Sequence, residues 1–211
     1  MRMMRLAAFS AVLVCAGSAL ADIVLKDASL DRPVVLDTDT NYFLRNVNIT
    51  NLTDAAALTL AGRVNSVTLE NCNLGRIVAG PEGKAAAMEC SGAVVGRFTA
   101  TNTSFFDAEN QLATLREGTF GTVTFDRCHF STSDRCLKEV QQKYPWRNWA
   151  PVTEFYNIER LELLDNDFTN TVIIIHPSVK KVVVRGQIPG LIIQNPHATK
   201  VIQVARDGED A

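Results

Sequence analysis

Residues 64–74 read VNSVTLENCNL, and the stretches FGTVTFDRCHF at 120–130 and IERLELLDNDF at 158–168 repeat the same arrangement. In each stretch two apolar residues alternate with polar ones, and the next small or apolar position of the pattern lies three residues further on instead of two. The alternation predicts a short strand with one buried face. The step of three predicts a corner, so the chain is expected to turn repeatedly between short strands.

The pattern recurs along most of the chain, which indicates a repeat architecture. Its seven copies, of which the last is partial, begin at Ile23, Tyr42, Val67, Phe98, Val123, Leu161 and Val182. The corner position is occupied in turn by Asp27, Asn46, Asn71, Asn102, Arg127, Asp165 and Gly186. Six of these seven residues are of types that tolerate a left-handed backbone. Further β-branched runs after several copies, as at 172–175, predict about three strands in each turn of a coil.

The three quoted stretches resemble the rung consensus of the pectin-lyase-like right-handed parallel β-helix superfamily, and the resemblance covers most of residues 23 to 204. It implies an all-β solenoid of about seven rungs, with a short helix in one insertion. A leucine-rich repeat is the alternative, because the stretches also fit L-x-x-L-x-L-x-x-N-x-L. The β-helix is favoured, because the copies begin at irregular intervals of 19 to 38 residues. The β-branched run at 171–175 also argues against a helix in that connection.

The N-terminal residues are typical of a secretory signal peptide. A short basic start precedes an apolar run from Leu6 to Ala16, and Ala19-Leu20-Ala21 forms a small-residue cleavage site. We expect a signal peptide at 1–21, a β-helix domain at 22–204 and a polar tail at 205–211. The alanine-rich signal is typical of bacteria, so the expected location is the periplasm or the medium. No later segment is apolar enough to predict a transmembrane span.

Four cysteines follow the predicted cleavage site, and an even number in an exported chain predicts disulfides. Cys72 and Cys128 occupy the same inward column two rungs apart, about 9.6 Å at the strand spacing. That separation exceeds the Cα distance of about 7 Å that a disulfide allows. The shortest remaining pairing is Cys72–Cys90 with Cys128–Cys136. No cofactor and no metal site is expected, because the chain has no C-x-x-C pair and no neighbouring histidine pair.

The composition limits the classes of function. The chain has 211 residues, of which 46% are hydrophobic and 21% charged, with a formal net charge of −2. This content of apolar residues excludes an intrinsically disordered chain. The slightly negative charge argues against a nucleic-acid binder, whose affinity depends on positive charge.

Stacked rungs predict a group of candidate catalytic residues. His129 and Asp167 hold equivalent positions just past the corner of successive rungs, near Asp126 and Asp165, and Lys138 is expected within reach of them. Such acids with a base and a cation suit polysaccharide hydrolysis or β-elimination. The alternative interpretation is a solvated ion pair on the outer surface of a strand.

The insertion at 131–160 carries a second candidate site. Ser133 and Asp134 are expected to cap a short helix, which Pro145 ends. The aromatic and basic residues that follow are a candidate sugar-stacking platform, and they are Tyr144, Trp146, Arg147 and Trp149. The alternative role for these rings is to cover one side of the coil.

The sequence favours a non-catalytic exported module that binds a glycan or a cell-envelope protein. The alternative function is a small polysaccharide lyase or glycoside hydrolase that acts on an acidic polysaccharide. His176 and His197 have no partner that the sequence pattern identifies.

Overall fold

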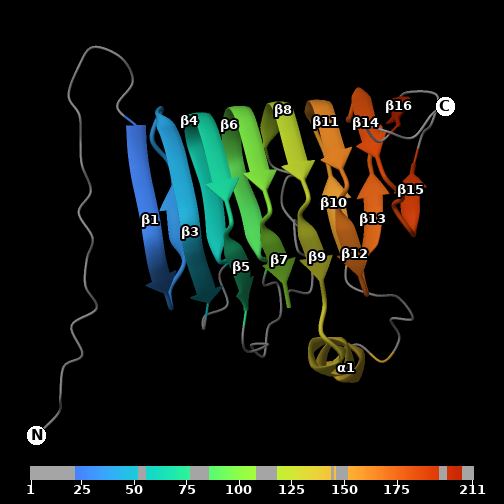
Figure 1. Ribbon diagram of the computed structural model, residues 1–211, viewed down its shortest axis with the longest axis horizontal. Coiled ribbons are helices and arrows are strands. Elements are labelled where there is room, and N and C mark those ends of the chain that lie inside the picture. The colour runs from blue at the N-terminus through green and yellow to red at the C-terminus, as the bar shows by residue number, and fades with distance from the viewer. Residues whose placement is uncertain are drawn as a thin grey trace, which may run out of the picture.

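The computed structural model describes residues 22–51, 56–76, 86–107, 118–143, 145, 152–194 and 199–205. The predicted signal peptide lies outside these described residues, as do Tyr144, Trp146, Arg147, Trp149 and the tail from residue 206. The described chain is a right-handed parallel β-helix. Its rungs stack along the long axis of the molecule, from β1 at one end to β15 and β16 at the other (Figure 1).

Three faces, which we name A, B and C, make up the coil. Face A contains β1 (Asp22–Leu30), β3 (Asn41–Asn51), β4 (Leu58–Glu70), β6 (Met88–Thr101), β8 (Thr119–Asp126), β11 (Ile158–Leu164), β14 (Lys181–Arg185) and β16 (Lys200–Val204). Face B contains β5 (Asn73–Arg76), β7 (Ser104–Phe106), β9 (His129–Ser131), β12 (Asp167–Thr169) and the end of β3. Face C contains β2 (Val34–Leu36), the first residues of β4 and β6, β10 (Val152–Phe155), β13 (Val172–Ile175) and β15 (Leu191–Ile193). Described neighbouring strands all pair in parallel.

The corner between faces A and B has the predicted left-handed backbone in every copy. The six non-glycine corner residues have φ between 49° and 53°, and Gly186 has φ of 87°. Asparagine side chains also connect successive corners: the amide of Asn71 donates to Asn46, and the amide of Asn102 donates to Asn71. The corner residues therefore fix the direction of the chain and link one rung to the next.

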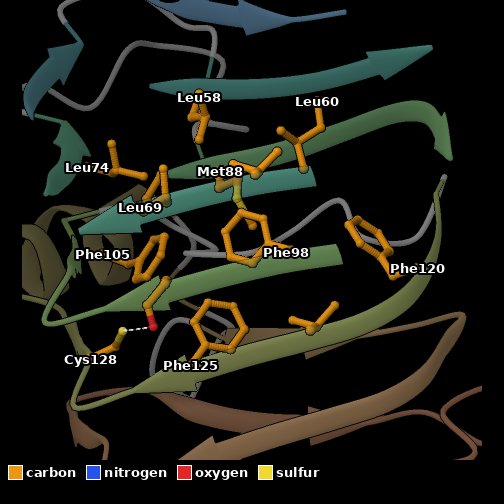
Figure 2. Packing of buried hydrophobic residues seen from close by; sticks show 14 of the residues in the cluster. Leu58, Leu60, Leu69, Leu74, Met88, Phe98, Phe105, Phe120, Phe125 and Cys128 are labelled. Carbon is orange, nitrogen blue, oxygen red and sulfur yellow. Dashed lines mark hydrogen bonds between the residues drawn. The ribbon is translucent and has the colours of Figure 1, made fainter. Parts of the chain in front are cut away.

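Equivalent inward positions stack into columns that form the core. On face B the column contains Leu74, Phe105, Phe130 and Phe168, in register on neighbouring strands. The rings of Phe105 and Phe130 are stacked with centroids 5.1 Å apart, and those of Phe130 and Phe168 are 4.9 Å apart. Figure 2 shows Phe105 near Leu74 and Phe125 in this interior. Burial of these side chains provides the main stabilisation of the coil.

The leucine-rich repeat alternative is wrong for this chain. Within the described residues the one helix is α1 (Asp134–Lys143), which lies beyond the end of β9 (Figure 1). It begins where the sequence predicts, because the Ser133 hydroxyl accepts a hydrogen bond from the Cys136 backbone N–H at 3.2 Å. Among the described residues, face C is built of strands, where a leucine-rich repeat would have helices.

The structure corrects the predicted disulfides, because no two described cysteines are joined. Cys72 and Cys128 do lie two rungs apart, with Thr103 in the register position between them. Cys90, however, pairs in register with Leu60 on face C, whereas Cys72 lies at the corner between faces A and B. The two side chains therefore enter the interior from different sides of the rung. All four cysteines are buried and fill the core as small apolar side chains.

Candidate functional site

His129 and Asp167 lie side by side, as the stacking of rungs predicts. They are register partners on β9 and β12, and the Nδ1 atom of His129 is 2.9 Å from an Asp167 carboxylate oxygen. The side chains are 60% and 59% exposed, so water screens this pair strongly. The geometry suits a histidine oriented by a carboxylate on an open surface.

Asp126 and Asp165 take part in a different group, centred on Arg185. The Nε atom of Arg185 is 2.6 Å from the Asp165 carboxylate, and its Nη2 atom is 3.5 Å from Asp126. Arg127 adds a contact of 3.1 Å to Asp126. Sequence reasoning missed Arg185, although it occupies the register column of Asp126 two strands further along. Both carboxylates are half-buried, and their cationic partners neutralise their charge at the corner.

The remaining predicted site residues lie on α1 or outside the described residues. Lys138 is exposed on α1. The aromatic and basic set of Tyr144, Trp146, Arg147 and Trp149 lies outside the described residues.

An open groove crosses the outer surface of face B and was not predicted. Its volume is about 510 Å³. Its described lining is made of Asn73, Ser104, Phe106, Asp107, Ser131, Thr132, Ser133, Asp134, Thr169 and Asn170. Asn73 and Ser104 belong to the same outward column as His129 and Asp167, so the histidine–carboxylate pair continues one row of this surface. The groove and the predicted pair therefore share one face.

Phe106 lies across Gly75, its register partner on β5. A Cβ atom placed on Gly75 would be 2.6 Å from the Phe106 ring, far inside van der Waals contact. The missing side chain at Gly75 thus leaves room for the ring on an outward position of face B. The ring is half-buried and supplies an apolar surface among hydroxyl and amide groups.

Hydrogen bonds hold one side of the groove in place. The Asp107 carboxylate accepts bonds from the Ser133 backbone N–H at 2.7 Å and from the Ser133 hydroxyl at 3.0 Å. The Asn170 amide donates to the Thr132 carbonyl at 3.1 Å and to Asp134 at 3.4 Å. These contacts join the end of β7, the start of α1 and the end of β12 into a fixed rim.

A buried carboxylate on face C was also missed. Glu154 is only 7% exposed, accepts a hydrogen bond from the Tyr156 hydroxyl at 3.1 Å, and lies 3.5 Å from the Nε2 atom of His176. The Tyr156 and His176 rings stack with centroids 3.4 Å apart. His176 therefore has partners that the sequence pattern did not identify. The available signal was the spacing of 20 residues between Tyr156 and His176, which equals the register shift from β10 to β13.

Burial sets the chemistry of two thiols. The pKa of the Cys128 thiol is raised from 9.0 to about 12, and burial likewise raises the pKa of Cys72. The Cys128 thiol donates to the Ala100 carbonyl at 3.3 Å, and Figure 2 shows this bond inside the coil. Because the thiolate is the nucleophilic form, these cysteines are structural.

The described residues contain no group of three or more His, Cys, Asp or Glu side chains arranged to hold a metal ion. They also contain no helix of the length and apolar character that a membrane span requires.

Comparison of the chain with family models, with curated proteins and with solved structures finds no match.

Proposed function

We propose that the mature chain is an exported, non-catalytic module that binds a glycan through the groove on face B. The observation that carries the proposal is the composition of this groove, in which hydroxyl and amide side chains surround the half-buried ring of Phe106. Sugars present hydroxyl groups around their edge and C–H groups on their faces. A site that orients them needs a few fixed polar groups beside an apolar surface.

Two features of the sequence complete the proposal. The signal-peptide pattern at 1–21 supports export to the periplasm or the medium. The rung pattern supports a place in the pectin-lyase-like superfamily, many of whose members act on carbohydrates. That argument from fold is weaker than the argument from the groove, because one fold carries many functions.

The experiment compares two phenylalanines on the purified mature chain. Phe106→Ala removes the groove's ring, whereas Phe43→Ala removes a ring that is 38% exposed on the outer surface of face A. We expect Phe106→Ala to weaken binding to a soluble polysaccharide at least about tenfold, which equals about 1.4 kcal/mol. Phe43→Ala should bind as the unchanged chain does. Equal effects of the two substitutions would contradict a site on face B.

The predicted aromatic segment at 144–149 supplies the competing location. If Trp146→Ala abolishes binding and Phe106→Ala does not, the glycan site belongs to that segment and not to the groove. Binding of an envelope protein without any glycan affinity would replace the proposed ligand class.

The enzymatic alternative is favoured by one observation, the contact of 2.9 Å between His129 and Asp167. An oriented histidine can act as a general base. We expect no turnover of acidic or neutral polysaccharides, with or without calcium, when reducing ends and the absorbance of unsaturated uronates are recorded. Turnover that His129→Ala or Asp167→Asn abolishes would establish the enzyme instead.

A further inference from the structure

We infer that the groove on face B selects uncharged glycans over acidic ones. We also infer that the bound glycan runs across the strands. This inference rests on the proposed function, because it names the ligand class of the same groove. It differs from the acidic polysaccharide that the enzymatic alternative requires.

The arrangement of the lining residues gives the direction of the bound chain. Asn73, Ser104, Ser131 and Thr169 come from four successive strands of face B, namely β5, β7, β9 and β12. Three strand spacings amount to about 14 Å, so an extended ligand meets one polar side chain from each rung. A chain that ran parallel to the strands would leave face B after the three residues of β7, β9 or β12.

The charges of the lining give the ligand class. Asp107 and Asp134 are both carboxylates on the side where α1 begins, and the described lining contains no lysine or arginine. The bonds of Asp107 to Ser133 and of Asp134 to Asn170 hold these carboxylates at the rim. A uronate chain in the groove would bring its own carboxylates within a Debye length of them, about 10 Å at 0.1 M salt. The resulting repulsion acts on acidic chains and leaves neutral ones unaffected.

Hydroxyl and amide groups support the same choice of ligand. Ser104, Ser131 and Thr169 each both donate and accept hydrogen bonds, as sugar hydroxyls do. Recognition of uronates would instead call for the charge-assisted bonds that arginine provides best. The described groove therefore matches a neutral ligand, because its hydroxyl and amide groups bind sugar hydroxyls and its rim carboxylates repel uronates.

The test removes the rim charge and keeps an oxygen that accepts a hydrogen bond at each rim position. Asp107 has φ of 49°, a conformation that asparagine tolerates, and an asparagine oxygen can still accept from the Ser133 N–H. The variant is the double substitution Asp107→Asn with Asp134→Asn. Its loop control is Asp31→Asn with Asp37→Asn, which removes equal charge from two exposed residues in the loops before and after β2.

Calorimetric titrations use soluble neutral glucans and mannans beside polygalacturonate and alginate, at low and high ionic strength. The unchanged chain should bind a neutral polymer at least about tenfold more tightly than either acidic polymer at low salt. The rim variant should reduce this ratio to less than about threefold, as should high salt for the unchanged chain, and the loop control should keep the full ratio. Preferential binding of an acidic polymer by the unchanged chain would overturn the inference, as would a rim variant that keeps the full ratio. Absence of binding to every polymer would overturn the proposed function itself.

Discussion

The corner residues show how single side chains direct the coil. A left-handed backbone is costly for most residues, by roughly 1–2 kcal/mol, and asparagine, aspartate and glycine adopt it most readily. The recurrence of these types at six of the seven corners therefore predicted the corners directly from the sequence. The corner asparagines have a second role, because their side chains form hydrogen bonds between neighbouring rungs.

Asn71 allows the two contributions of a corner residue to be separated. Asn71→Gly keeps the left-handed backbone and loses the amide bonds to Asn46 and Asn102. Asn71→Ala loses the amide bonds and also introduces a residue for which the left-handed backbone is costly. We expect the free energy of unfolding to fall by about 1 kcal/mol for glycine and by about 2 kcal/mol or more for alanine. Urea unfolding measures both values, and equal losses would show that backbone conformation contributes nothing at this corner.

Arg127 is the one corner residue of a type that disfavours its backbone conformation, with φ of 52°. Its contact with Asp126 is on the surface, where an ion pair contributes little. Arg127→Asn removes the backbone cost and places an amide beside Asn102. The variant should be about 0.5–1 kcal/mol more stable in urea unfolding. A loss of stability would mean that the Asp126 contact outweighs the backbone term.

The buried thiol of Cys128 predicts a loss of stability at alkaline pH. Its pKa is raised from 9.0 to about 12 in the folded chain, so the unfolded chain releases the proton first. Its stabilising contribution is therefore complete below a pH of about 9 and falls as the pH rises toward about 12. Urea unfolding of the unchanged chain and of Cys128→Ala across about pH 8 to 10.5 measures this contribution. The alanine variant should lose stability less steeply, and parallel curves would contradict the assignment.

The cysteines also show where residue-level prediction ended. The number of cysteines and the expected export predicted disulfides, but neither observation says from which face a side chain enters the interior. The register placed Cys72 and Cys128 correctly relative to each other, because both belong to copies of the repeat. Cys90 belongs to face C, where no template residue was available to place it.

At the level of elements, stacked strands turn equivalent positions into columns of one chemical type. The phenylalanine column of face B is the clearest case, because Phe130 lies between Phe105 and Phe168 and is fully buried. Removal of the middle ring leaves a cavity that touches two neighbouring rungs. Column neighbours therefore depend on one another more than residues adjacent in the sequence do.

Phe130→Ala measures the contribution of this column. We expect the free energy of unfolding to fall by about 3–5 kcal/mol, and by clearly less for Phe130→Leu, which refills part of the space. Phe43→Ala on the outer surface is the control and should change stability by no more than about 0.5 kcal/mol. If Phe130→Ala cost as little as the control, the stacked interior would be contradicted.

Elements with a local pattern could be predicted, both within the template and between its copies. The alternation at 158–164 predicted β11, the β-branched run at 172–175 predicted β13, and Ser133 predicted the start of α1. The Glu154, Tyr156 and His176 cluster was missed because β10 and β13 have their own register of 20 residues, which the longer insertion before β10 conceals.

At the scale of the whole molecule, the coil makes one continuous surface from residues that are far apart in the sequence. Asn73 and Thr169 line the same groove because face B aligns four rungs. The repeat predicted the row that contains His129 and Asp167. It did not predict the groove, because the template ends before the second outward row, which contains Phe106 and Ser131, and before the rim at the start of α1. The space that Phe106 occupies also depends on Gly75, its partner on the neighbouring strand.

The central claim is that a glycan binds in the groove on face B, and a heteronuclear NMR titration tests it most directly. Increasing amounts of a soluble neutral oligosaccharide are added to the isotopically labelled mature chain, and the backbone amide shifts are followed. The account predicts saturable shifts on β5, β7, β9 and β12 and at the start of α1, with Phe106 and Ser131 among the largest and Phe43 unchanged. Saturable shifts confined to residues 144–149 or to face A, or no shifts with neutral gluco- and manno-oligosaccharides, would contradict it.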